Sequence, residues 1–94
     1  MGIEMLGHRY VPEIMLELRK HPDLSKIELA CRLGHTRTIM IRLNELEREG
    51  WVEYHKSVRY NAKLVRLTHN GEIVANSLHK IVMTLRRPSE GKDR

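Results

Sequence analysis

The chain has 94 residues, which is enough for one compact domain and too few for two. Its composition, 40% hydrophobic and 31% charged, excludes a disordered chain, and an enzyme with its own substrate pocket would be unusual at this size. Seventeen Lys and Arg against twelve Asp and Glu give a net charge of +5, which makes a polyanion such as nucleic acid a natural partner.

Cys31 is the one cysteine, so an internal disulfide framework is excluded and a reducing compartment is indicated. Its thiol is expected to be a small buried hydrophobe, with a redox sensor or an intersubunit disulfide as alternatives. Residues 1–10 lack the basic start and apolar centre of a signal peptide, and no apolar run is long enough to span a membrane. We therefore expect a soluble, cytoplasmic protein.

The first predicted helix begins near Val11, where Pro12 suits the first turn because its missing N–H costs nothing there. Its apolar face consists of Ile14, Met15 and Leu18. Cations at its end suit the helix dipole, and Pro22 follows the last turn. The pattern predicts a helix of about ten residues that packs one face on a core.

Two further helices follow at short distance. Ser25 and Glu28 have the spacing of a capping box, and Gly34 is placed to end the helix that they begin. After one or two residues a longer helix is predicted over residues 36–49, ended by Gly50. Its inward positions are Ile39, Leu43 and Leu46. Helices joined by so tight a turn must cross at a steep angle.

The character of the sequence changes after residue 50. Strand-like runs at residues 51–54 and 64–67 flank a polar, basic loop, which predicts a β-hairpin with a long tip. A last helix then begins with Thr68 or Asn70 as its N-cap. Residues 87–94 form a polar tail.

Three phrases give the chain a family resemblance. L-S-x-x-E-L-A-x-x-L-G at residues 24–34 and L-x-x-L-E-x-x-G-W-V at residues 43–52 resemble the two parts of the bacterial and archaeal helix-turn-helix signature. L-T-x-x-G at residues 67–71 is similar to the junction between wing and last helix in MarR-like, ArsR-like and PadR-like regulators. Together they make the chain similar to winged helix-turn-helix proteins.

The resemblance implies a mainly α fold with a small β-hairpin, in the order α-α-α-β-β-α, and a long C-terminal dimerisation helix. Residues 11–67 would form the winged helix-turn-helix, residues 68–86 the dimerisation helix and residues 87–94 the tail, and residues 1–10 could pack at the dimer interface. The implied function is that of a homodimeric transcriptional regulator on double-stranded DNA, associated with the nucleoid.

The third helix is the expected recognition helix, because its amino-terminal part would enter the major groove. The residues predicted to meet base edges or nearby phosphates are Arg37, Thr38, Ile41, Arg42 and Glu45. A merely solvated face is the alternative, but an outward Ile41 on a polar surface favours contact.

Two further groups would contact the sugar-phosphate backbone or the minor groove. The wing group is His55, Lys56, Arg59 and Lys63. Ser25 and Lys26 would bind phosphate at the start of the second helix, where anions bind well. A solvated hairpin tip is the alternative for the wing.

The last helix has more apolar surface than a domain this small needs for its own core. The predicted dimer stripe is Val74, Leu78, Ile81 and Leu85. Pairing two such helices across a two-fold axis would set two recognition helices about 34 Å apart. The alternative is that the stripe closes the core of the monomer.

No metal and no cofactor are expected, because the histidines lack helical ligand spacing and no Gly-rich phosphate loop is present. No nucleophile motif or pair of carboxylates in an apolar setting indicates an enzyme. Two other functions stay open: an architectural protein that coats DNA without sequence preference, and a winged-helix module for protein interaction.

Overall fold

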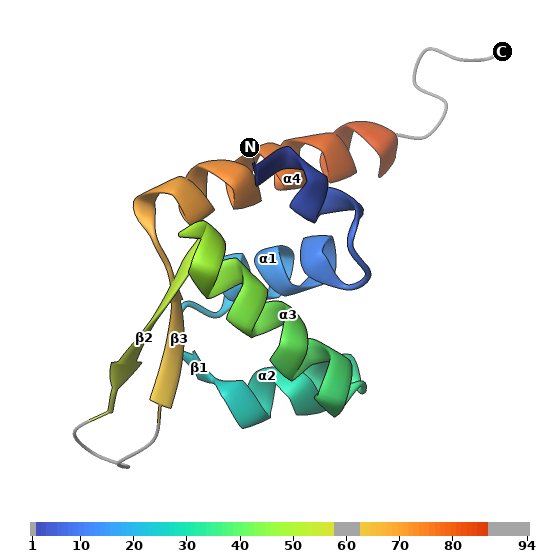
Figure 1. The fold of residues 1–94 in the computed structure, drawn as a ribbon. Coiled ribbons are helices and arrows are strands. Elements are labelled where there is room, and N and C mark those ends of the chain that lie inside the picture. Colours follow the sequence, from blue (N-terminus) through green and yellow to red (C-terminus); the bar gives the residue numbers. More distant parts are fainter. Residues whose placement is uncertain (1, 58–62, 87–94) are drawn as a thin grey trace, which may run out of the picture.

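The computed structural model describes residues 2–57 and 63–86 (Figure 1). The elements follow in the predicted order, with a short 3-10 helix before them and a two-residue strand before the second helix. Their bounds are η1 Gly2–Gly7, α1 Val11–Lys20, β1 Leu24–Ser25, α2 Lys26–Leu33, α3 Thr36–Glu49, β2 Val52–Lys56, β3 Lys63–Leu67 and α4 His69–Arg86. The predicted fold class is therefore confirmed.

The ends of α2 and α3 form as the sequence indicates. The Ser25 hydroxyl oxygen accepts from the Glu28 N–H at 3.1 Å, and the Glu28 carboxylate accepts from the Ser25 N–H at 3.0 Å, which completes the capping box. Gly34 and Gly50 end the two helices with φ of 79° and 83°, in the left-handed region that a residue with a Cβ rarely adopts. Of these features, Gly34 forms the short turn between α2 and α3.

Thr68, and not Asn70, caps α4. The Gly71 N–H donates to the Thr68 hydroxyl oxygen at 3.0 Å, and that hydroxyl donates to the Gly50 carbonyl at 2.5 Å. The Thr68 N–H donates to the Trp51 carbonyl at 3.0 Å. One residue therefore joins the end of α3, the start of the hairpin and the start of α4. Asn70 was the wrong alternative, because it already lies inside the first helical turn.

The sheet is antiparallel, in the order β1-β3-β2. Tyr54 and Leu24 both pair with Val65, so the short strand before α2 lies on the other side of β3 from β2. β1 was not predicted from the sequence, since two residues are too few for an alternating pattern. Its consequence is that the segment directly before α2 is paired with Leu64 and Val65 of β3.

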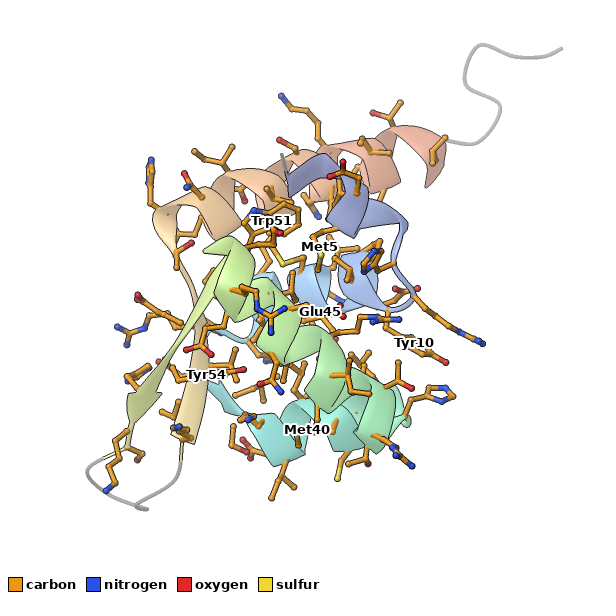
Figure 2. The ribbon with its side chains drawn as sticks, viewed as in Figure 1. Met5, Tyr10, Met40, Glu45, Trp51 and Tyr54 are labelled. Carbon is orange, nitrogen blue, oxygen red and sulfur yellow. The ribbon has the colours of Figure 1, made fainter. Side chains whose placement is uncertain are left out.

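A single cluster of apolar side chains forms the core, and α1 lies between α4 and the pair α2–α3 (Figure 1). Fully buried members include Ile14, Leu29, Ile39, Leu43 and Val65. Figure 2 shows Trp51 beneath α4 and Met5 on the inner side of η1, where both side chains are buried. No described helix combines the length and apolarity that crossing a membrane requires.

Cys31 corrects one expectation, because its side chain is exposed and not buried. Leu29 and Ala30 are the buried residues of α2, and a step of about 100° per residue turns Cys31 outward. Ile27, one turn earlier, shares this outer face and is 69% exposed. The short α2 therefore presents a mixed outer surface and not a continuous apolar one.

Candidate nucleic-acid interface

The outer surface of α3 combines basic, amide and apolar side chains. Ile39, Leu43 and Leu46 are buried on the inner side. The exposed residues on the opposite side are Arg37, Ile41, Asn44 and Arg48, with Thr38 half-buried on the flank. Ile41 is 46% exposed, as its outward position predicted. This face offers guanidinium, amide and methyl groups, which are the groups that proteins present to base edges in the major groove.

Arg42 and Glu45, which were predicted to meet DNA, lie on the flank of α3 that faces the N-terminal segment. Arg42 donates from Nε to the Arg9 carbonyl and from Nη1 to Glu45 Oε1, each at 3.0 Å. His8 Nδ1 lies 3.4 Å from the same carboxylate oxygen. Both side chains are therefore engaged within the chain, where they attach the segment before α1 to the side of α3.

The same contacts set the titration of Glu45. Burial opposes its charged form, but hydrogen bonds from His8 and Arg42, together with their positive charges, outweigh burial and lower the pKa of the carboxyl. Beside this cluster the rings of Tyr10 and His35 stack at 4.5 Å, and the Arg9 guanidinium lies over the Tyr10 ring. The N-terminal segment thus contacts α3 at its start and along its flank.

The hairpin residues predicted to contact DNA divide into three groups. Lys56 and Lys63 are exposed at the outer ends of β2 and β3. His55 Nε2 lies 3.2 Å from Asp23 Oδ1, and Arg66 Nη2 lies 3.5 Å from the same oxygen, so His55 faces the loop after α1. Arg59 lies outside the described residues. The described part of the hairpin therefore presents two lysines outward.

Tyr54, which was not predicted from the sequence as a site residue, occupies the junction of α2, α3 and the hairpin. The Lys26 ammonium lies 4.9 Å from its ring centroid and the Lys63 ammonium 5.5 Å from it. Its hydroxyl is buried without a hydrogen-bond partner among the described residues. Burial, helped by the nearby Glu47 carboxylate, raises the pKa of Tyr54 to about 12. The sequence feature that could have identified Tyr54 is the alternation of strand residues, which puts Tyr54 on the same face as Val52.

Of the two backbone-contact candidates, Ser25 uses its side chain to cap α2, whereas Lys26 extends over Tyr54. Figure 2 shows Tyr54 on the side of the hairpin that faces the helices, and Met40 where α3 lies against α2. A groove of about 340 Å³ lies between these elements and is lined by Ser25, Lys26, Ile27, Met40 and Lys63. The start of α2, the middle of α3 and the hairpin therefore share one continuous surface.

The predicted dimer stripe on α4 divides into two halves. Val74 and Leu78 are half-buried and pack against the core of their own chain. Ile81 and Leu85 are 54% and 79% exposed. The carboxyl half of α4 extends beyond the core of its own domain, which is why the same face of the helix is covered in one half and open in the other (Figure 1).

Comparisons with known proteins agree with this architecture. A scan against protein-family models and a search of curated protein sequences find no match. Among solved structures, FabT of Streptococcus pneumoniae in complex with DNA matches with a TM-score of 0.74 and 22% identity over 98% of this chain and 71% of FabT. MarR of E. coli matches with a TM-score of 0.73 and 22% identity over 84% of this chain and 63% of MarR. The fold is a winged helix-turn-helix.

A third structure of this winged helix-turn-helix type is MepR, a transcription regulator of the Staphylococcus aureus multidrug efflux pump MepA. It matches with a TM-score of 0.72 and 19% identity over 81% of this chain and 58% of MepR. The chain thus spans less than two thirds of the length of the MepR and MarR structures. In the terms of this fold α2 and α3 form the helix-turn-helix, and the hairpin β2–β3 is the wing.

Proposed function

We propose that this chain is a transcriptional regulator that binds double-stranded DNA as a homodimer, with α3 in the major groove. The observation that supports this most directly is the outer face of α3, where Arg37, Ile41, Asn44 and Arg48 are exposed together. An Arg can bind guanine with two hydrogen bonds, an Asn can do the same with adenine, and an Ile can lie against a thymine methyl group. FabT, which has the same fold, was solved in complex with DNA.

The wing and the start of α2 would add contacts to the phosphate backbone. Lys56 and Lys63 project from the wing, and Lys26 lies at the first position of α2. Arg59 and His55 belong to the same predicted group, with His55 closest to the loop after α1. Such contacts orient a protein on the duplex without selecting sequence. Specificity would then come from α3, and association with the nucleoid would follow from binding to DNA.

A charge reversal at the start of α3 tests the proposal. Arg37→Glu should lower affinity for duplex DNA by at least tenfold, since it replaces a guanidinium in the groove by a carboxylate facing phosphates. Lys20→Glu is the matched control, because Lys20 is exposed at the end of α1 and the substitution changes net charge equally. Equal losses in the two variants would mean that only total charge matters and would refute a site on α3.

The homodimer is proposed to form through the carboxyl half of α4. Ile81 and Leu85 would pack against a second copy, and Val74 and Leu78 would support them from within each core. A two-fold axis there would place two α3 helices about 34 Å apart, one turn of DNA.

Sedimentation of purified variants tests this interface. Ile81→Glu should shift the protein from dimer to monomer while leaving the monomer folded, because the side chain is 54% exposed in the single chain. Ile27→Glu is the matched control, because Ile27 on α2 is also exposed, at 69%, and its substitution should leave the dimer intact. A wild-type chain that sediments as a monomer at micromolar concentration would contradict the proposed dimer.

A further inference from the structure

Lys26 and Lys63 lie 37 positions apart in the sequence and meet at one aromatic ring. The antiparallel pairing of β1 with β3 explains why. Ser25 pairs with Leu64, so the next residue after β1 and the residue before Leu64 lie opposite each other at the same end of the sheet. Tyr54, which pairs with Val65 from the other side of β3, places its ring within 6 Å of both ammonium groups.

Two like charges opposite each other in a sheet repel unless something compensates them. Among residues 2–57 and 63–86 no carboxylate forms an ion pair with Lys26 or Lys63, although Arg42, Arg32 and Arg66 all have such partners. The aromatic ring holds each ammonium by its quadrupole and leaves the full positive charge in place. The chain therefore keeps two positive charges beside one ring that ion pairs would have neutralised.

The ring itself stays uncharged. Its hydroxyl is buried, and a tyrosine hydroxyl, with an ordinary pKa of about 10, is protonated at physiological pH. The capping box uses the Ser25 and Glu28 N–H groups, so neither of these two amides is open to an anion. What remains open toward solvent is the groove between α2, α3 and the wing, with the two lysines on its border.

We propose that Lys26 and Lys63 form one binding site for a phosphodiester group, and that Tyr54 is the positioning residue that holds both lysines toward it. The inference rests on the proposed DNA-binding function and deepens it. One phosphate of the DNA backbone, beside the major groove that α3 enters, would be bound by α2 and the wing together, although these elements are distant in sequence. Tyr54 acts through the lysines and does not contact DNA.

The test compares variants at Tyr54 by their affinity for one duplex over a range of salt concentrations. Tyr54→Phe keeps the ring and should bind as the wild type does. Tyr54→Leu removes it and should weaken binding about fivefold to tenfold, because two cation–π contacts at an exposed site are lost.

Lys26→Ala and Lys63→Ala should each reduce the slope of log affinity against log salt by about one. Lys20→Ala is the control, an exposed lysine at the end of α1, and should leave the slope unchanged.

A measurement without DNA separates this inference from the proposed function. In NMR spectra of the free chain, the side-chain methylene signals of Lys26 and Lys63 should be shifted upfield by the ring in wild type and Tyr54→Phe, and not in Tyr54→Leu. Titration with inorganic pyrophosphate should move both sets of signals together and saturably.

Failure of the wild type to bind duplex DNA would refute the proposed function, and the pyrophosphate titration would then decide the lysine site alone. The inference is overturned if pyrophosphate moves neither lysine, or if Lys26→Ala and Lys63→Ala affect DNA binding no more than Lys20→Ala does. It is also overturned if Tyr54→Leu, folded by its melting curve, binds DNA as tightly as Tyr54→Phe.

Discussion

Substituting Gly71 by Ala should destabilise the protein, although Ala is the better helix former. A Cβ at this position would overlap the Trp51 carbonyl oxygen and would lie 2.9 Å from its carbonyl carbon and 3.2 Å from Leu67 Cδ2. Because the first two of these atoms belong to backbone, α4 must move away from the start of β2. That movement would stretch the hydrogen bond from the Thr68 N–H to the same carbonyl.

The expected loss in the free energy of unfolding follows from three contributions. Overpacking a tight contact costs about 1 to 3 kcal/mol, and a weakened hydrogen bond costs about 1 kcal/mol more. Replacing a helical Gly by Ala returns about 1 kcal/mol. The net loss should be about 2 kcal/mol, which in a domain of this size lowers Tm by about 8 to 16 °C.

Thermal unfolding followed by circular dichroism, at one protein concentration for all variants, measures this loss. Gly7→Ala is the matched control, since a Cβ there would meet nothing within 4 Å, and its Tm should stay close to that of the wild type. An unchanged or raised Tm for Gly71→Ala would refute the close packing of α4 on the Trp51 carbonyl and with it the tight junction between wing and last helix.

Three further predictions concern single side chains. Ser25→Ala should lower the free energy of unfolding by about 1 kcal/mol in chemical denaturation, because it removes one half of the capping box. Glu45→Gln should destabilise the protein at neutral pH. Contacts with His8 and Arg42 lower the pKa of Glu45, so its contribution to folding stability is present above the ordinary carboxyl pKa and is lost as pH falls through the lowered value. The melting temperatures of the wild type and Glu45→Gln should therefore converge in acid. A difference that stays constant with pH would contradict this. Cys31 should react with a thiol reagent in the folded protein, one group per chain, and slow labelling that tracks unfolding would contradict its exposure.

The elements that were predicted correctly from the sequence are those whose ends and faces are determined by residues close together in the chain. Ser25 with Glu28, and the glycines at 34 and 50, satisfy helix ends from within a few positions, so the bounds of α2 and α3 follow from local chemistry. The inner face of α3 follows from its period in the same way. The order of elements, and the fold that it implies, could therefore be predicted without coordinates.

What could not be predicted depends on contacts between distant segments. The bond from Arg42 to the Arg9 carbonyl joins residues 33 positions apart, and no local pattern shows that a basic residue on the flank of a helix is already engaged. Tyr54 looks like an ordinary strand residue until β1 brings Lys26 beside it. Cys31 was misjudged because α2 is short and buries only one narrow face.

The central claim, that α3 of a homodimer selects DNA sequence, is tested most directly by enrichment of bound sequences from a pool of random duplex DNA at near-physiological salt, with the full untagged chain. The expected result is recovery of an inverted repeat whose half-site centres lie about ten base pairs apart. DNA retained without a common motif would contradict sequence selection and favour an architectural role. No retention at all would contradict DNA binding itself and direct attention to the exposed Ile27 and Ile41 as a protein-binding surface.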